Sequence, residues 1–180
     1  MPNCSLTLAG LERDCEPSRG GIMRVIAALF ESVTGVTITD GKISGITKAP
    51  GARFYDYYFR RDSSSYSSTL NTDPSTGLNN VTTDIALKFA RMDTAKRIEM
   101  STLSKAGLVL LVQDANKKWW YFGKDEEVRA SAGTGATGQA RTDENAYTIT
   151  LQDNSEDWPY EVNVGTGAGA VDIDELLKAA

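Results

Sequence analysis

The sequence predicts a mainly β protein: a β-sandwich or barrel with one packed α-helix, a long hairpin and extended terminal arms. Two observations lead to this prediction. First, about eight to ten segments of strand length, either apolar or alternating, are separated by turn residues along the chain. Second, one segment near the middle combines apolar residues at helical spacing with the residues that begin and end a helix.

The first predicted strands lie between residues 20 and 61. "GGIMRVIAALF" (20–30) is continuously apolar and predicts a buried strand. "GVTITDGKISGIT" (35–47) predicts a β-hairpin, because Asp40-Gly41 suits a type I′ turn whose central residues need positive φ. "ARFYDYYFRR" (52–61) alternates, which predicts a strand with Tyr55, Tyr57 and Phe59 on one face.

A long hairpin is predicted over about 62–83. This span has 22 residues, of which 11 are Ser or Thr and only Asp62 and Asp73 are charged. Its flanks favour β structure, and "DPSTGLN" between them favours a turn, because Pro74 fixes φ and Gly77 permits a left-handed residue. Loops of this length are usually functional or disordered. The alternative to a functional hairpin is an ordinary mobile surface loop.

The second half of the chain begins with the predicted helix, about 93–106, with Asp93 as its N-cap and Gly107 just past its end. The face expected to pack carries Ala95, Ile98, Thr102 and Ala106, with Met92 and Leu103 beside it. Strands are then predicted within 108–123, 145–153 and 158–164, and Pro159 restricts the last one to an edge or a bulge. "ASAGTGATGQA" (130–140) is expected to be a flexible loop.

Three parts are expected along the chain: an N-terminal arm (1–19), the β domain (20–164) and a C-terminal arm (165–180). No apolar run approaches the length of a transmembrane helix, and the N-terminal residues do not resemble a signal peptide, so we expect no membrane association. Cys4 and Cys15 are too few for a disulfide framework. We expect both thiols to be reduced, although a bridge between them remains an alternative.

The chain contains no histidine, which excludes Ser-His-Asp and Cys-His catalytic arrangements and removes the commonest metal ligand. "GTGATG" (133–138) lacks the Gly-Lys-Ser/Thr of a phosphate-binding loop. The aromatic run Trp119–Phe122 suits stacking on a sugar or a base, but side chains alternate along a strand, so at least one tryptophan should be in the core. We therefore expect no catalytic, cofactor-binding or metal-binding residues.

Charge is distributed unevenly along the chain. Residues 1–106 hold 13 Lys or Arg and 11 Asp or Glu, a net charge of +2, whereas residues 107–180 hold 6 and 13, a net charge of −7. This asymmetry is compatible with identical subunits that meet through oppositely charged faces, an arrangement that builds rings and filaments. Basic residues are too sparse for a nucleic-acid-binding surface, because the whole chain carries −5.

The order of segments resembles the tail tube (major tail) proteins of tailed bacteriophages, especially those of phages and prophages of Bacteroides-like hosts. The resemblance covers most of the chain and is carried by "LAGLERDCEPSRGGI", "ARFYDYYFRRDSSSYSSTLN", "NNVTTDIALKFARMDTAKRIE", "WWYFGKD" and "NAYTITLQDNSEDWPYEV". It implies a virion protein, assembled in the host cytoplasm with other tail proteins. Its subunits would form hexameric rings, stacked into a tube through which double-stranded DNA passes without specific binding.

The resemblance also implies that the hairpin and the arms bridge neighbouring rings. The candidate hairpin contacts are Ser64, Tyr66, Thr69, Asn71, Asp73, Pro74, Gly77 and Asn79. The candidate arm contacts are Leu6, Leu8, Leu11, Ile173, Leu176 and Leu177. Two alternatives stay open: another virion component, such as a head decoration protein, a neck protein or an injection-machine tube subunit, and a carbohydrate-binding β-sandwich that uses the Trp119–Phe122 strand.

Overall fold

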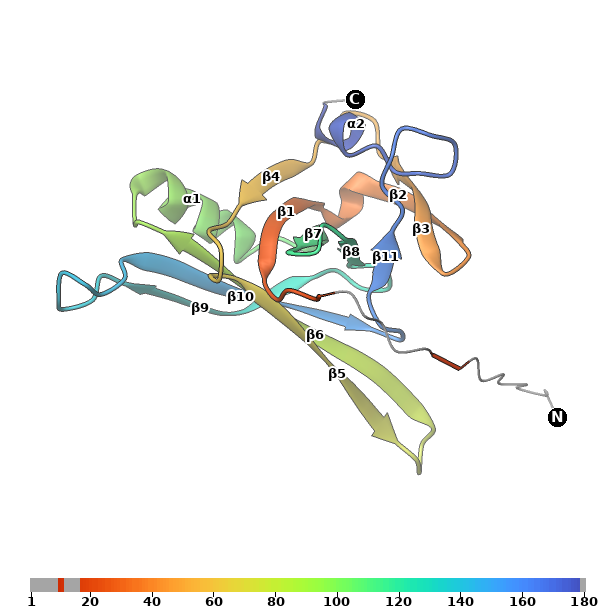
Figure 1. Cartoon of the computed structure of the whole chain (residues 1–180), viewed down its shortest axis with the longest axis horizontal. Helices are drawn as coiled ribbons and strands as arrows, with labels where there is room; N and C mark the ends of the chain where they lie inside the picture. The colour runs from red at the N-terminus through yellow and green to blue at the C-terminus, as the bar shows by residue number, and fades with distance from the viewer. Residues whose placement is uncertain (1–9, 12–16, 179–180) are drawn as a thin grey trace.

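The computed structural model describes residues 10–11 and 17–178, and within them the chain forms two β-sheets, as predicted. The larger sheet has the spatial order β2 (Val33–Thr39), β3 (Lys42–Lys48), β11 (Tyr160–Val162), β8 (Trp119–Phe122), β7 (Leu108–Asp114), β1 (Ile22–Leu29) and β4 (Tyr55–Tyr58). The smaller sheet has the order β5 (Ser65–Asp73), β6 (Leu78–Ala90), β10 (Ala146–Ser155) and β9 (Arg129–Ala136). Helix α1 (Thr94–Leu103), helix α2 (Ile173–Leu177) and a 3-10 turn (Phe30–Ser32) complete the fold (Figure 1).

The two sheets enclose one hydrophobic core. Alternate residues of β1 and β7, among them Val25 and Leu110, face the four-stranded sheet and meet Ile85 and Leu151 there; all four side chains are fully buried. This alternation is the period of two that a strand imposes on its side chains. Among the described residues the four-stranded sheet buries only this side, and its other side is left free for a different role.

A second core lies on the opposite side of the seven-stranded sheet. It contains Ile26 of β1, Leu111 of β7, Tyr121 of β8 and Phe54, all buried, together with residues of α2. In Figure 1 the seven-stranded sheet curves around this region and α2 lies over its open side. The central strands β1 and β7 are therefore covered on both faces, which explains their continuously apolar sequences.

The C-terminal residues belong to this second core, so the prediction of an arm over 165–180 is wrong for its apolar side chains. Ile173 and Leu176 are 7% and 4% exposed, and Leu177 packs half-buried beside them. The amide of Phe54 donates to the carbonyl of Leu176, and Lys48 Nζ donates to the carbonyl oxygens of residues 175 and 178. The open side of the curved sheet offers an apolar surface within the same chain, so these residues need no second subunit to cover them.

Two local predictions are confirmed. Strands β2 and β3 form the predicted hairpin, and its turn residues Asp40 and Gly41 have φ of 52° and 74°, as a type I′ turn requires. Helix α1 begins after Asp93, whose side chain accepts a hydrogen bond from the Lys96 amide. The predicted packing face of α1 needs correction, because Ala95, Ile98 and Thr102 are exposed. Leu103, which was expected beside that face, is the buried residue of the helix.

Two strand predictions need correction. Residues 130–136 were expected to be a flexible loop, but they form β9, an edge strand that pairs with β10 through seven residue pairs. Backbone hydrogen bonding to a long neighbour outweighs the low strand propensity of Gly and Ala. The strand at Pro159 was expected at an edge or a bulge, but β11 lies between β3 and β8. Pro159 precedes this strand, so its missing N–H interrupts no pairing within the sheet.

Candidate functional site

The predicted long hairpin is the most prominent surface feature of the molecule. Strands β5 and β6 pair in unbroken register from Ser65↔Ala86 to Asp73↔Leu78. At the tip, the Asp73 carboxylate accepts hydrogen bonds from the amide (2.9 Å) and the hydroxyl (2.6 Å) of Ser75. These hydrogen bonds lower the pKa of Asp73. The turn is completed by Gly77, which has a φ of +70° and donates its amide to the Asp73 carbonyl.

The outer part of the hairpin extends beyond the rest of its sheet. The last residue of β10, Ser155, pairs with Val81, so residues 71–80 form a two-stranded ribbon. Figure 1 shows this ribbon projecting from the body of the molecule. Leu78 in the ribbon and Leu70 just before it are 62% and 45% exposed. Isolated two-stranded ribbons are marginally stable in water, so a partner surface would stabilise this one.

The four-stranded sheet has two chemically different faces. The face toward the seven-stranded sheet is apolar, as described above. The opposite face, called the polar face from here on, consists almost entirely of hydroxyl, amide and small side chains. Its residues are Ser65, Ser67, Thr69 and Asn71 of β5; Asn80, Thr82, Asp84, Ala86 and Lys88 of β6; Thr148, Thr150, Gln152 and Asn154 of β10; and Arg129, Ala132 and Thr134 of β9.

Side chains on the polar face are hydrogen-bonded across neighbouring strands. Asn71 Nδ2 donates to Thr82 Oγ1 (3.2 Å), and Thr82 Oγ1 donates to Asn154 Oδ1 (3.1 Å), which links β5, β6 and β10. Gln152 Nε2 donates to Asp84 Oδ1 (2.9 Å). Lys88 pairs with the carboxylate of Glu144, so its charge is offset locally. The polar face is therefore an ordered surface with little net charge.

Both edges of the four-stranded sheet are free within the part of the chain that the structure describes. Strands β5 and β9 each pair on one side only. Such edges expose unpaired backbone N–H and C=O groups, which other strands can bind. The side chains along β9 are small, Ser131 to Ala136, and all six residues are exposed. A neighbouring strand would therefore meet little steric obstruction at this edge.

The predicted hairpin contacts separate into two groups. Thr69, Asn71, Asp73, Pro74, Gly77 and Asn79 are exposed, on the outer half of the hairpin or in its turn. Ser64 and Tyr66, by contrast, belong to the body of their own domain. Ser64 is 5% exposed and its hydroxyl accepts from the Lys88 amide, while Tyr66 packs edge-on against Phe122. Ser64 and Tyr66 are therefore corrected from contact residues to residues that anchor the base of the hairpin.

The predicted arm contacts that the structure describes are not brought together. Leu6 and Leu8 lie outside the described residues, as do Cys4 and Cys15. Leu11 is 99% exposed. Ile173, Leu176 and Leu177 contribute to their own core, as described above. Sequence reasoning missed β9 and the polar residues of β10; their alternation with Ile149 and Leu151 was the signal that could have revealed the polar face.

The aromatic strand β8 does not offer a platform for stacking sugars. Trp119, Tyr121 and Phe122 are 5%, 2% and 1% exposed. Trp120 is half-buried, packs on the core between the sheets and donates its indole N–H to Asp114 Oδ2 (3.1 Å). The strand thus serves the two cores, and the carbohydrate-binding alternative loses the side chains on which it was based.

Asp153 is the one buried carboxylate among the described residues, at 3% exposed. Burial raises its pKa, while hydrogen bonds from the Ser155 hydroxyl and the Gly123 amide act in the opposite direction. The carboxylate ties the end of β8 to β10 and therefore has a structural explanation. Within the described ranges, no group of three or more His, Cys, Asp or Glu side chains is placed to hold a metal ion.

Comparison with known proteins gives no relative. No family model, curated protein or solved structure matches the chain. Among the described residues, no helix is long and apolar enough to cross a membrane. The functional interpretation therefore depends on the geometry of the hairpin, the free edges and the polar face.

Proposed function

We propose that this chain is a tail tube subunit of a bacteriophage virion, which forms rings that stack into a conduit for double-stranded DNA. The observation that carries the proposal is the four-stranded sheet, which combines two free edges with a polar face of little charge. The resemblance of the segment order to tail tube proteins supports the same function. In this proposal, other tail proteins are partners of the assembled tube.

The free edges suit ring formation. Neighbouring strands in the four-stranded sheet are all antiparallel, so its edge strands β5 and β9 run in opposite directions. When β9 of one subunit pairs with β5 of the next, the antiparallel order continues around the ring. This interface is heterologous, because two different surfaces meet, and such interfaces generate closed rings when the rotation closes.

The edges are also staggered along the strands. Strand β5 lies level with residues 78–86 of β6, whereas β9 lies, through β10, level with residues 84–90. The centres of β5 and β9 are therefore offset by about five residues, or about 17 Å along the strand direction, while four strands span about 19 Å across the sheet. When β9 of one subunit is aligned with β5 of the next, this offset tilts the strands by about 40° from the ring axis, which lies within the 35–45° found in closed barrels.

This tilt predicts the size of a ring of six subunits. Its inner barrel has about 24 strands, and at about 4.8 Å per strand and about 40° of tilt its backbone diameter is about 48 Å. Side chains narrow the opening, but the channel that remains is wide enough for a DNA duplex. The polar face would line this opening and the seven-stranded sheet would lie outside it.

A wall of this composition suits the passage of DNA. Binding to the phosphate backbone needs several Lys or Arg side chains that converge on one surface. Among the described residues, the basic side chains on the polar face are Lys88 and Arg129, and they are paired with Glu144 and Glu127. Hydroxyl and amide groups leave a shallow, even potential, so a duplex meets no site at which it is held.

Engineered disulfides test the ring interface. In a Cys4→Ser, Cys15→Ser background, Thr69→Cys on β5 and Ala132→Cys on β9 place a thiol on each edge of the polar face. If β5 and β9 of neighbours pair, oxidation of the assembled protein joins subunits into a ladder of covalent oligomers, because paired strands bring Cα atoms within disulfide range. The ladder should end at the ring number.

The matched control replaces Ala132→Cys by Thr34→Cys, which lies on β2, an edge strand of the other sheet. This control should give no ladder. Equal ladders from the Thr69/Ala132 and Thr69/Thr34 cysteine pairs would refute the proposed interface. Assembled rings or tubes that form without any β5–β9 crosslink would refute it as well.

A further inference from the structure

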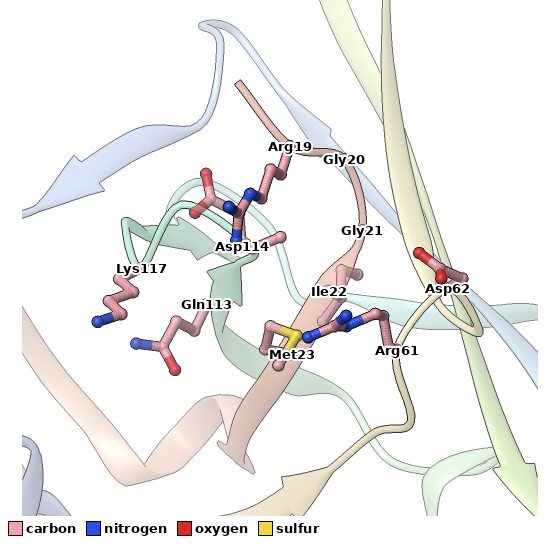
Figure 2. A pocket seen from close by; sticks show the side chains of 11 residues that line it. Arg19, Gly20, Gly21, Ile22, Met23, Arg61, Asp62, Gln113, Asp114 and Lys117 are labelled. Atoms are coloured by element: carbon pink, nitrogen blue, oxygen red, sulfur yellow. The ribbon is translucent and has the colours of Figure 1, made fainter. Parts of the chain in front are cut away.

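A charged cleft lies at one end of the strands, and the proposed tube does not explain it. The cleft has a volume of about 640 Å³ and is formed where the chain enters β1, where β4 leads into β5, and at the turn after β7. Its charged side chains are Arg19, Arg61, Lys117, Asp62 and Asp114. Figure 2 shows Arg61 extending from its loop toward Met23 of β1, and Asp62 follows it on the same loop.

The backbone around the cleft is held in place by the chain itself. The Arg19 amide donates to Asn116 Oδ1 (2.9 Å), and Asn116 Nδ2 donates to the Arg19 carbonyl (3.0 Å). The Ala115 amide donates to the Gly21 carbonyl (3.0 Å). These bonds fix the segment before β1 to the turn after β7, so the cleft is a preformed feature.

The cations of the cleft are available, whereas one of its two carboxylates is not. Asp114 accepts hydrogen bonds from the amides of Asn116 (2.8 Å) and Lys118 (2.9 Å) and from the Trp120 indole (3.1 Å), and so it is committed to its own turn. Arg19, Arg61 and Lys117 are exposed and take part in none of the ion pairs between described residues. The cleft can therefore receive an anionic partner.

The opposite end of the strands carries the complementary charge. A wider hollow of about 900 Å³ lies between the hairpin tip and the loops that follow β8 and β10. The described residues that line it carry four acidic side chains, Asp125, Glu126, Glu156 and Asp157, and no Lys or Arg. One of these charges is offset nearby, because Lys124 pairs with Asp125. These loops are called the acidic loops from here on.

The register of the strands places the cleft and the acidic loops far apart. Asp114 ends β7 beside the cleft, while Leu108 at its start bridges to Val128, directly after the first acidic loop. The six residue steps between Leu108 and Asp114 correspond to about 20 Å. In the other sheet, residue 62 precedes β5 and the tip follows it, so the cleft and the hollow lie at opposite ends there as well.

We infer that the cleft lined by Arg19, Arg61 and Lys117 binds the acidic loops of a second copy of this chain, stacked end to end. This inference deepens the proposed function and rests on it: lateral pairing uses the sheet edges, so the strand ends face the next ring. The occupant follows from charge complementarity, because the acidic loops lie at the strand end opposite the cleft. The hairpin tip lies beside these loops and would approach the next ring with them.

Such contacts act mainly on the rate and direction of assembly. Ion pairs at the rim of an interface contribute modestly to affinity, but complementary potentials speed encounter and exclude like-charged pairings. A subunit with one positive and one negative end adds to a growing stack in one orientation only. The inference therefore predicts elongation that slows as salt rises, because exposed charges are screened.

Charge reversal at each end tests the inference. Arg61→Glu with Lys117→Glu should slow elongation about tenfold or more at low salt, measured by light scattering and confirmed by electron microscopy. Glu126→Lys with Glu156→Lys should do the same, because it places like charges at the same contact. A chain with all four changes has both ends reversed, is complementary again and should elongate at nearly the wild-type rate.

The control is Arg97→Glu, an exposed reversal on α1 that lies in neither region. Unchanged thermal unfolding shows that each variant still folds. If single-end reversals behave like Arg97→Glu, or the fourfold variant stays slow, this inference is wrong while the tube remains. If the wild-type chain shows no self-association at any salt concentration, both this inference and the proposed function are wrong.

Discussion

Replacement of Leu176 by Ala should destabilise the isolated subunit. Leu176 is 4% exposed in the second core, where α2 covers the open side of the seven-stranded sheet. Leu→Ala changes in protein cores cost about 2–5 kcal/mol in the free energy of unfolding. Helix α2 has only five residues, so the site can relax, and we expect the lower half of that range, about 2–3 kcal/mol.

The loss should be visible in both chemical and thermal unfolding. For a chain of this size, about 2–3 kcal/mol lowers the melting temperature by roughly 4–12 °C. Urea unfolding followed by tryptophan fluorescence is a suitable assay, because Trp119 belongs to the same core. The control is Glu175→Ala, an exposed neighbour on the same helix that should change the free energy of unfolding by less than about 0.5 kcal/mol.

This experiment distinguishes an α2 that packs on its own core from a C-terminal arm that contacts other subunits. An arm residue that contacts other subunits would leave the stability of the monomer unchanged and weaken only assembly. If Leu176→Ala unfolds within about 0.5 kcal/mol of the wild type, the docking of α2 on its own core is refuted.

Three further predictions concern other parts of the molecule. The raised pKa of Asp153 means that the folded protein binds a proton at this group more tightly than the unfolded chain does, so the group's contribution to stability is largest at low pH and is lost as pH rises through the folded-state pKa. Asp153→Asn should therefore flatten the pH dependence of the free energy of unfolding in urea above pH ~4. An unchanged slope would contradict this reasoning. Asp93→Ala removes the N-cap of α1 and should cost about 1 kcal/mol in the same assay, whereas Asp93→Asn should cost less; equal costs would argue against a capping role. Gln152→Lys adds a cation to the polar face and should give assembled tubes a salt-sensitive affinity for duplex DNA that wild-type tubes lack; binding that is equally strong in both would contradict a passive wall.

The sequence predicted those elements whose signals are local. The Asp40-Gly41 turn, the Asp93 cap and the turn of the long hairpin each depend on a few adjacent residues, and all three are present. The alternation in 81–89 and 145–153 likewise predicted two strands, which are β6 and β10.

The errors concern features that depend on distant parts of the chain. Residues 130–136 have little strand propensity of their own and become a strand because β10 offers a long free edge. The C-terminal apolar residues seemed to need a partner, and the curvature of a sheet built from residues 22–162 supplied one within the chain. The cleft and the hollow beside the acidic loops each unite residues from three segments, a combination that no single stretch of sequence reveals.

A cryo-electron microscopy map of the assembled wild-type protein tests the central proposal most directly. The proposed function predicts a hollow tube whose inner wall is a continuous barrel of β5, β6, β10 and β9, with Thr82, Thr150 and Gln152 of the polar face toward the axis. A map in which the seven-stranded sheet faces the axis, or in which Arg60, Arg61, Lys96 or Arg97 forms a continuous ring around it, would contradict the account.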